Sequence, residues 1–242
     1  MKRREIWFVS DLHLSPSTSP LLQAFSRLVQ GCMQQAESLY ILGDLFDAWI
    51  GDDDPSPLVN VVTSQLRQLT DAGVNVYFQA GNRDFLIGEA FATATGITLL
   101  PDYHVISLSG YATLLMHGDL LCSDDLHYQQ IRRRIRTPEW RERALAKPLW
   151  LRKGLARWYR IRSQFHARQT DMNIMDVNQD TVQQTMERYN VTQLIHGHTH
   201  RPGIHPHTLH NNCVGKRYVL APWFRQGHAL CWDSGHYRNE QF

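Results

Sequence analysis

The amino-acid sequence predicts an α/β fold, and two features of its hydrophobic pattern support this prediction. Short apolar, β-branched runs that end in polar residues or glycine are typical of buried strands, and they lie at 6–9, 39–42, 74–78, 113–116 and 194–195. Longer segments with apolar residues at helical spacing lie at 21–35, 58–71 and 180–189. Strands that alternate with helices favour an α/β core.

Two segments in the second half of the chain predict β-hairpins. Residues 107–116 are expected to turn at Ser109-Gly110, and residues 229–237 at Asp233-Ser234-Gly235. Because a hairpin joins antiparallel strands, we expect mixed sheets rather than purely parallel ones.

The chain has 242 residues, of which 43% are hydrophobic, enough for one substantial core. We therefore expect a single domain over residues 1–242, with an Arg- and Trp-rich helical insertion at about 125–170. Residues 126–170 contain thirteen Lys and Arg against two acidic residues, whereas the remainder contains twelve basic and twenty-one acidic residues. Such an uneven charge distribution usually marks a surface for an anionic partner.

The sequence also bears on the compartment. Four cysteines are widely scattered and form no C-x-x-C pair, so a reducing compartment is expected. The apolar run that follows the basic N-terminus is too short for a secretory leader. No segment reaches the roughly 20 apolar residues that span a bilayer, so any membrane association is expected to be peripheral.

Polar motifs follow five of the predicted strands. The carboxyl ends of strands in an α/β sheet share one edge, so these side chains are expected to converge there. Carboxylates, an amide oxygen and imidazoles together suit Mn²⁺, Fe²⁺ or Zn²⁺ better than Ca²⁺. The motifs are Asp11-Leu12-His13, Gly43-Asp44, Gly81-Asn82, His117-Gly118 and Gly197-His198-Thr199-His200.

This ordered set of motifs resembles that of the calcineurin-like metallophosphoesterases. The resemblance implies an α/β/β/α sandwich of two mixed sheets, with two metal ions about 3.5–4 Å apart that bind phosphate and activate water. It also implies the metal ligands. Asp11, His13 and His200 would hold one ion, Asn82, His117 and His198 the other, and Asp44 both.

A closer resemblance is to the UDP-2,3-diacylglucosamine pyrophosphohydrolases of lipid A biosynthesis, carried by residues 43–54, 81–86, 174–179 and 195–202. It implies a two-Mn²⁺ enzyme at the cytoplasmic face of the bacterial inner membrane. A hydroxide between the ions would attack the α-phosphorus, giving UMP and 2,3-diacylglucosamine 1-phosphate.

The same resemblance assigns roles to individual residues. The catalytic residues would be Asp44, Asn82, Arg83 and His117, and the substrate contacts would be Asn82, Arg83, Asp125, Ser163 and His198. The chain departs from the family pattern in three places. It has Asp47 where Glu is frequent, and Ala167 and Thr170 where the family has Asn and Lys.

Arg83 supports this substrate class on physical grounds. Many calcineurin-like phosphatases have a histidine after the Asn of the G-N motif, and that histidine can protonate an alkoxide leaving group. A phosphate monoester, whose second pKa is about 6, leaves as an anion without a proton donor. Arginine at this position can instead donate a fork of hydrogen bonds to phosphoryl oxygens, so a pyrophosphate substrate is favoured.

The insertion allows two interpretations. Its apolar residues, such as Trp140, Trp150 and Trp158, could simply be core. Alternatively, a basic amphipathic helix with aromatic residues can lie in the interface of an anionic membrane, and its apolar face could bind acyl chains. We expect it to act as a lid over the metal ions.

Other activities remain open at this point. The same scaffold serves dinucleotide polyphosphatases, phosphoprotein phosphatases and cyclic nucleotide phosphodiesterases. A nuclease could use Arg132, Arg133, Arg134 and Arg136 as a phosphate footprint, although no nucleic-acid partner is expected. A non-catalytic scaffold is disfavoured by the complete ligand set.

Three further features have local interpretations. The acidic run 52–54 is expected to form a solvated loop and to cap the following helix. Asp84 and Asp119 are expected to orient metal ligands rather than to bind metal. The role of His196 stays open, because a residue at the end of a strand can point into the core.

Overall fold

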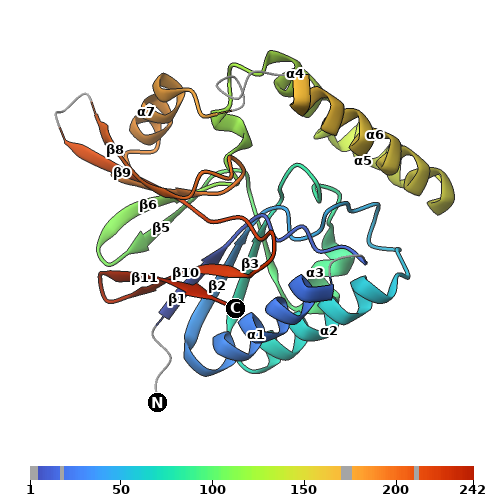
Figure 1. Cartoon of the computed structure of the whole chain (residues 1–242), viewed down its shortest axis with the longest axis horizontal. Helices are drawn as coiled ribbons and strands as arrows, with labels where there is room; N and C mark the ends of the chain where they lie inside the picture. Colours follow the sequence, from blue (N-terminus) through green and yellow to red (C-terminus); the bar gives the residue numbers. More distant parts are fainter. Residues whose placement is uncertain (1–4, 17–18, 170–175, 210–212) are drawn as a thin grey trace.

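The computed structural model describes residues 5–16, 19–169, 176–209 and 213–242, and for residues 19 and 160–169 it describes only the backbone. It contains two mixed sheets that pack face to face, with helices on both outer faces (Figure 1). The predicted α/β/β/α sandwich is therefore confirmed.

The first sheet has the order β11-β10-β1-β2-β3-β4. Strands β1 to β4 are parallel, and the C-terminal hairpin of β10 and β11 adds to β1 in antiparallel orientation. The bounds are β1 Glu5–Val9, β2 Ala36–Leu42, β3 Asn75–Gln79, β4 Thr98–Leu100, β10 His228–Asp233 and β11 His236–Gln241.

The second sheet has the order β5-β6-β7-β9-β8. Its inner strands β6, β7 and β9 are parallel, and β5 and β8 pair antiparallel at the two edges. The bounds are β5 His104–Leu108, β6 Tyr111–Leu115, β7 Gln193–His196, β8 Gly203–Thr208 and β9 Val214–Val219.

Both predicted hairpins are present. Ser109 and Gly110 join β5 to β6 with φ of 51° and 84°, and Ser234 and Gly235 join β10 to β11 with φ of 49° and 93°. Positive φ at both central residues suits the right-handed twist of the paired strands. The turn residues therefore predicted the hairpins correctly.

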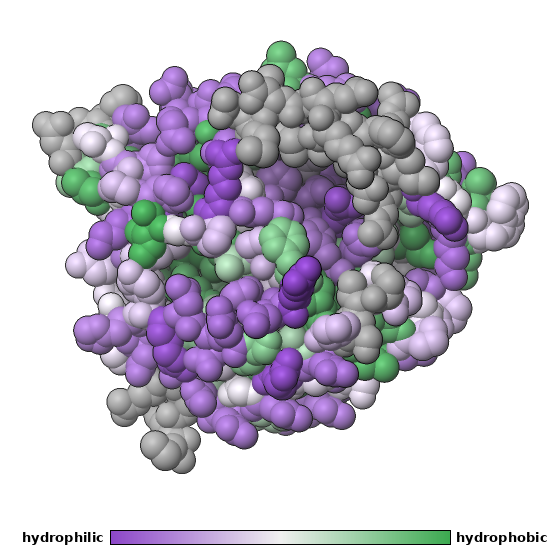
Figure 2. Space-filling view, in the orientation of Figure 1, coloured by the Kyte–Doolittle hydropathy of each residue, from purple (hydrophilic) through white to green (hydrophobic). Residues whose placement is uncertain are grey.

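Three apolar clusters hold the layers together. One lies between the first sheet and the helices α1 Ser19–Gln35, α2 Pro57–Asp71 and α3 Glu89–Thr95. Another lies between the sheets, where Phe8 and Leu42 meet Leu115 and Ile195. The third packs α7 Gln179–Arg188 on the outside of the second sheet. The face of the molecule seen in Figure 2 is mainly hydrophilic, with apolar residues in small separate patches.

Residues 126–169 form three helices between η1 Asp119–Leu121 and the segment that leads to α7. These helices, which we call the lid, stand beside the sandwich at the upper right of Figure 1. They are α4 Leu126–Ile135, α5 Pro138–Leu145 and α6 Leu149–Gln169. Among the described residues, no helix combines the length and the apolar character needed to cross a membrane.

Candidate dinuclear metal centre

The turns after β1, β2, β3, β6 and β7 meet at one edge of the sandwich and carry all the predicted metal ligands. Backbone hydrogen bonds join these turns in pairs. The N–H of His13 donates to the carbonyl of Asp44 at 2.9 Å, and the N–H of Gly197 donates to the carbonyl of His117 at 2.9 Å. Each sheet therefore fixes the spacing of its own ligand-bearing turns.

The predicted ligands form two overlapping groups. Atoms able to bind metal in Asp11, His13 and His200 lie within 4.8 Å of one another, and the same holds for Asp11, Asp44 and His117. The two groups share Asp11. Asp44 belongs to the second group and also faces the first, with its Oδ2 3.9 Å from Nδ1 of His13 and its Oδ1 3.9 Å from Nε2 of His117. This is the place that the resemblance gives to a bridging carboxylate.

Asn82 completes the second group. Its Oδ1 lies 3.0 Å from Nε2 of His117 and 3.2 Å from Nδ1 of His198. The other ring nitrogen of His117 lies 2.8 Å from the carbonyl oxygen of Leu42. A carbonyl only accepts, so Nδ1 of His117 carries a proton, and Nε2 is the ring nitrogen that faces Asn82 and is available to a metal ion. This is the arrangement in which metal-binding histidines are usually held.

The buried atoms of the site fit metal ions. Oδ1 of Asp11 and Nδ1 of His13 are buried and have no hydrogen-bond partner among the residues that the structure describes. Buried polar atoms without partners cost free energy, so they are rare unless a ligand satisfies them. Two divalent cations would satisfy this set of carboxylate, imidazole and amide atoms. Together with the family match below, these atoms indicate a dinuclear centre.

The backbone is strained at the same residues. Asp11, His13, Asp44, His198 and His200 all have positive φ, between 48° and 68°. Non-glycine residues rarely adopt this conformation, and such residues cluster at functional sites. Space is also limited, because a Cβ at Gly81 would collide with Asp44 and one at Gly197 with Asp11. Glycine is required at both positions by close approach.

Burial and neighbouring charges together set the protonation of the ligands. Burial lowers the pKa of His13 to about 3 and of His198 to about 4, so both imidazoles are neutral, as metal binding requires. Burial also raises the pKa of Asp44 to about 7, and the neighbouring carboxylates of Asp84 and Asp11 add to this effect. Without cations, negative charge on Asp44 is therefore costly, whereas the neighbouring histidines lower the pKa of Asp11.

Asp84 supports the site through the backbone rather than through an imidazole. Its Oδ2 accepts from the N–H of Leu45 at 2.7 Å, and its Oδ1 accepts from Gly81 at 2.9 Å and from Asp44 at 3.3 Å. It thereby ties the turn after β2 to the turn after β3. Asp84 was expected to orient metal ligands, and in the structure it holds the backbone of the turn that carries Asp44.

Asp119 connects the site to the lid. It accepts from the hydroxyl of Tyr128 at 2.6 Å and from Nε of Arg132 at 2.6 Å, both on α4. Arg136, the C-cap of this helix, donates to the carbonyl of Gly81 at 2.8 Å, directly before Asn82. No local pattern separates these arginines from their exposed neighbours, because burial within a basic helix is set by tertiary packing.

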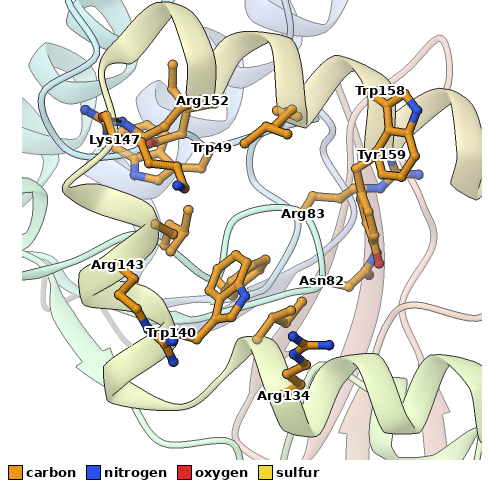
Figure 3. Close-up of a pocket in the computed structure, with 18 of the residues that line it drawn as sticks. Trp49, Asn82, Arg83, Arg134, Trp140, Arg143, Lys147, Arg152, Trp158 and Tyr159 are labelled. Atoms are coloured by element: carbon orange, nitrogen blue, oxygen red, sulfur yellow. Dashed lines mark hydrogen bonds between the residues drawn. The ribbon is translucent and has the colours of Figure 1, made fainter.

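The lid and the turns enclose a cavity of about 480 Å³ (Figure 3). Asn82 and Arg83 lie at its border with the metal centre, and Asp47 also lines it. Most of the wall is apolar. It includes Trp49, Ile50, Phe85, Leu86, Ile135, Trp140, Ala144, Leu155, Ala156, Trp158 and Tyr159.

Of the remaining positions predicted to contact substrate, the structure describes the side chain of Asp125 alone. Asp125 is the N-cap of α4, where its Oδ1 accepts from the N–H of Tyr128 at 2.9 Å. Ser163, Ala167 and Thr170 lie outside the residues whose side chains the structure describes. Their roles stay predictions.

The interpretation of the acidic run 52–54 as the cap of the following helix was wrong. Ser56 caps α2 by accepting from the N–H of Val59. Asp52 instead accepts from the N–H groups of Gly88 and Phe91 at the start of α3, each at 3.0 Å. Short sequence separation favoured the nearer helix, whereas the fold brings residue 88 next to residue 52.

Asp53 and Asp54 bind basic side chains of the lid. Arg152 on α6 donates from both terminal nitrogens to the Asp53 carboxylate, at 2.7 and 2.5 Å, and Lys153 lies 3.5 Å from Asp54. These pairs attach the start of α6 to the loop after β2.

Comparison with known proteins agrees with this geometry. A family model described as calcineurin-like phosphoesterase matches residues 4–202. A UDP-2,3-diacylglucosamine hydrolase of Edwardsiella ictaluri is 48% identical over 94% of this chain and 88% of its own length. One of Xanthomonas oryzae pv. oryzae is 45% identical over 97% and 98%. An archaeal phosphodiesterase of solved structure, 10% identical, covers 98% of this chain and 99% of its own with a TM-score of 0.50, which shows a shared fold alone.

Proposed function

Since the chain belongs to the calcineurin-like phosphoesterase family of metal-dependent hydrolases, we propose that it hydrolyses the pyrophosphate bond of UDP-2,3-diacylglucosamine in lipid A biosynthesis. The observation that carries this proposal is the apolar cavity that begins at Asn82 and Arg83. It places room for acyl chains directly beside side chains suited to phosphate. The relatives named for this substrate support the same conclusion.

Different residues of the chain would bind the metal ions and the phosphoryl oxygens of the substrate. Asp11, His13 and His200 would hold one ion, Asn82, His117 and His198 the other, and Asp44 would contact both. Two bound divalent ions would polarise the phosphoryl oxygens and lower the pKa of the attacking water. Arg83 contacts Asp44 through its backbone N–H, which donates to Oδ1 of Asp44 at 2.8 Å. Its side chain lines the cavity and points toward Trp158 and Tyr159 (Figure 3). There it can bind the phosphoryl oxygens of the substrate.

The products follow from the position of attack. Attack at the α-phosphorus gives UMP and 2,3-diacylglucosamine 1-phosphate, and the second product leaves as an anion without a proton donor. Mass spectrometry of products, with and without Mn²⁺, tests the reaction. In ¹⁸O-water the label should enter UMP, and label confined to the sugar phosphate would contradict attack at the α-phosphorus.

We infer that the ions are Mn²⁺, because oxygen and imidazole donors without thiolate suit a borderline cation of this kind. Activity lost in a chelator should return most fully with Mn²⁺. Full recovery with Zn²⁺ but not with Mn²⁺ would refute this assignment.

We also propose that the lid docks on the cytoplasmic face of the bacterial inner membrane. Trp150 and Trp158 on α6 are 74% and 57% exposed, beside Lys153 and Arg157. Basic and aromatic side chains together favour the interface of an anionic membrane. The protein should float with anionic vesicles and detach as salt rises, each surface arginine or lysine adding about 1 kcal/mol. Absence of binding to anionic vesicles at low salt would exclude this docking.

The nuclease alternative is weakened by the lid itself. Arg132 is buried and bonded to Asp119 and Asp102, and Arg136 is bonded to the backbone before Asn82. Two of the four arginines of the supposed footprint are therefore engaged inside the protein.

A further inference from the structure

Arg217 on β9 is a buried charge with an unusual pair of partners. Its side chain is 5% exposed. Its Nη1 donates to Nε2 of His196 and its Nε donates to Nε2 of His207, each at 3.1 Å. None of the ion pairs found among the described residues includes Arg217. The charge of Asp176 acts on Arg217, but no ion pair joins the two side chains among the described residues. Because a buried guanidinium without a hydrogen-bonded carboxylate costs free energy, its two imidazole contacts require an explanation.

His196 is fully buried at the end of β7, and both of its ring nitrogens are used. Arginine can only donate, so Nε2 of His196 is the acceptor. The other nitrogen, Nδ1, lies 2.7 Å from the carbonyl oxygen of Gly197 and must be the donor. Burial and the charge of Arg217 lower the pKa of His196 to about 3, in agreement with a neutral ring. One tautomer and one ring orientation are thereby selected.

The His196 ring lies where two ligand-bearing turns meet. A Cβ at Gly118 would lie only 2.6 Å from Nδ1 of His196, so the ring rests directly on the turn that follows His117. On its other side the chain passes through Gly197 into the turn of His198 and His200, both with positive φ. A displaced His196 ring would therefore disturb both turns.

We propose that Arg217 is a positioning residue of the metal centre, which acts by locking His196 between the turn that carries His117 and the turn that carries His198 and His200. Its second contact, to His207 on β8, fixes the guanidinium from the neighbouring edge strand. Without Arg217, Nε2 of His196 becomes a buried acceptor with no partner, and the strained turns lose their support. The consequence is weaker metal binding, whatever the substrate.

Titration of the metal-free protein with Mn²⁺ tests this role without measuring activity. Arg217→Met keeps the length and removes the donors, and it should weaken Mn²⁺ affinity about 10–100-fold, the usual range for partners of metal ligands. Lys216→Met is the matched control, because Lys216 is the exposed neighbour on the same strand and should leave the affinity unchanged. Arg217→Lys should restore part of the affinity.

A double-mutant cycle separates positioning from general stabilisation. His196→Phe keeps a ring without polar atoms and should weaken Mn²⁺ binding as much as Arg217→Met. If Arg217 acts through His196, the double variant binds no more weakly than either single variant. Additive losses would overturn the proposal, and so would an Arg217→Met variant that binds Mn²⁺ with the parent affinity.

If Arg217→Met does not fold, the Mn²⁺ affinity of Arg217→Lys is measured instead. The lysine ammonium can reach only one of the two imidazoles. Weaker Mn²⁺ binding by a folded Arg217→Lys protein with parental thermal stability supports the proposal. Parental affinity in that variant together with parental affinity in His196→Phe overturns it.

Discussion

The turns of the metal centre and the lid border the same cavity but are built in opposite ways. The turns are buried, bonded to one another through the backbone, and strained at the predicted ligands. In the described part of the chain, the lid is attached to the body mainly through polar side chains. Tyr128, Arg132 and Arg136 bind Asp119 and the Gly81 carbonyl, and Arg152 binds Asp53. Trp140, Trp158 and Tyr159 of the lid line the cavity, and Trp150 is exposed.

This difference indicates a division of labour. Chemistry at phosphorus needs atoms held to a fraction of an ångström, which buried and mutually bonded turns provide. A variable apolar substituent needs space and area rather than fixed polar geometry. Changes at the turns should therefore affect every substrate, whereas changes in the lid should affect the diacylated substrate.

The largest effect is expected for Asp44→Asn, which keeps the shape but removes the charge shared by both ion positions. We expect turnover to fall by more than about 10³-fold, beyond the loss of a single transition-state hydrogen bond. Turnover of the diacylated substrate and of a soluble substrate should fall by the same factor. Near-normal turnover at saturating Mn²⁺ would disprove the dinuclear assignment.

The same substitution should stabilise the metal-free protein. The folded state raises the pKa of Asp44 from 3.8 to about 7. It therefore binds this proton more tightly than the unfolded chain, and stability falls as pH rises from about 4 to 7. The neutral amide of the Asp44→Asn variant avoids this loss, so at pH 8 in chelator the variant should melt several degrees higher, at about 2–4 °C per kcal/mol. A lower melting temperature would contradict the charge assignment.

Arg83→Ala should come next, with a loss of about 10²–10³-fold in turnover if the guanidinium stabilises charge in the transition state. Metal content should stay at the parent level, because the hydrogen bond of residue 83 to Asp44 comes from the backbone N–H, which alanine keeps. Arg133→Ala is the matched control, since Arg133 is exposed on α4 and carries the same charge. Loss of bound metal in the Arg83 variant would show that its role is structural.

Local patterns predicted the turns better than the lid contacts. Asp11, His13 and Asp44 directly follow their strands, so the order of motifs was enough to place them at one edge. Arg217 gives no such signal, because its importance comes from the pairing of β9 with β7, which no local pattern encodes. The role of Asp52 was misassigned for the same reason, since its partners are 36 and 39 residues away.

Trp140→Ala tests the lid side of the comparison. Trp140 lines the cavity and lies against Phe85, with ring centroids 5.9 Å apart. Loss of this wall should lower kcat/KM for the diacylated substrate about 10–100-fold, in line with about 1.5–3 kcal/mol for one large buried apolar side chain. A soluble aryl phosphodiester should be hydrolysed as before. Trp150→Ala, which removes an exposed tryptophan outside the cavity, should affect vesicle binding instead.

The smallest effect is expected at the attachment of α6. Asp53→Asn weakens the two-pronged contact with Arg152, but the Asp53 side chain is 58% exposed, so water and salt screen this pair. KM for the diacylated substrate should rise about two- to fivefold at low salt, corresponding to about 0.5–1 kcal/mol, and the difference should shrink in high salt. Asp54→Asn is the control, because its partner Lys153 is itself exposed and 3.5 Å away.

Arg152 lowers the pKa of Asp53, so the contribution of this pair to the attachment of α6 is present above about pH 4 and is lost as pH falls further. If Asp53→Asn changed Mn²⁺ affinity or the hydrolysis of a soluble diester, the separation between the turns and the lid would not hold.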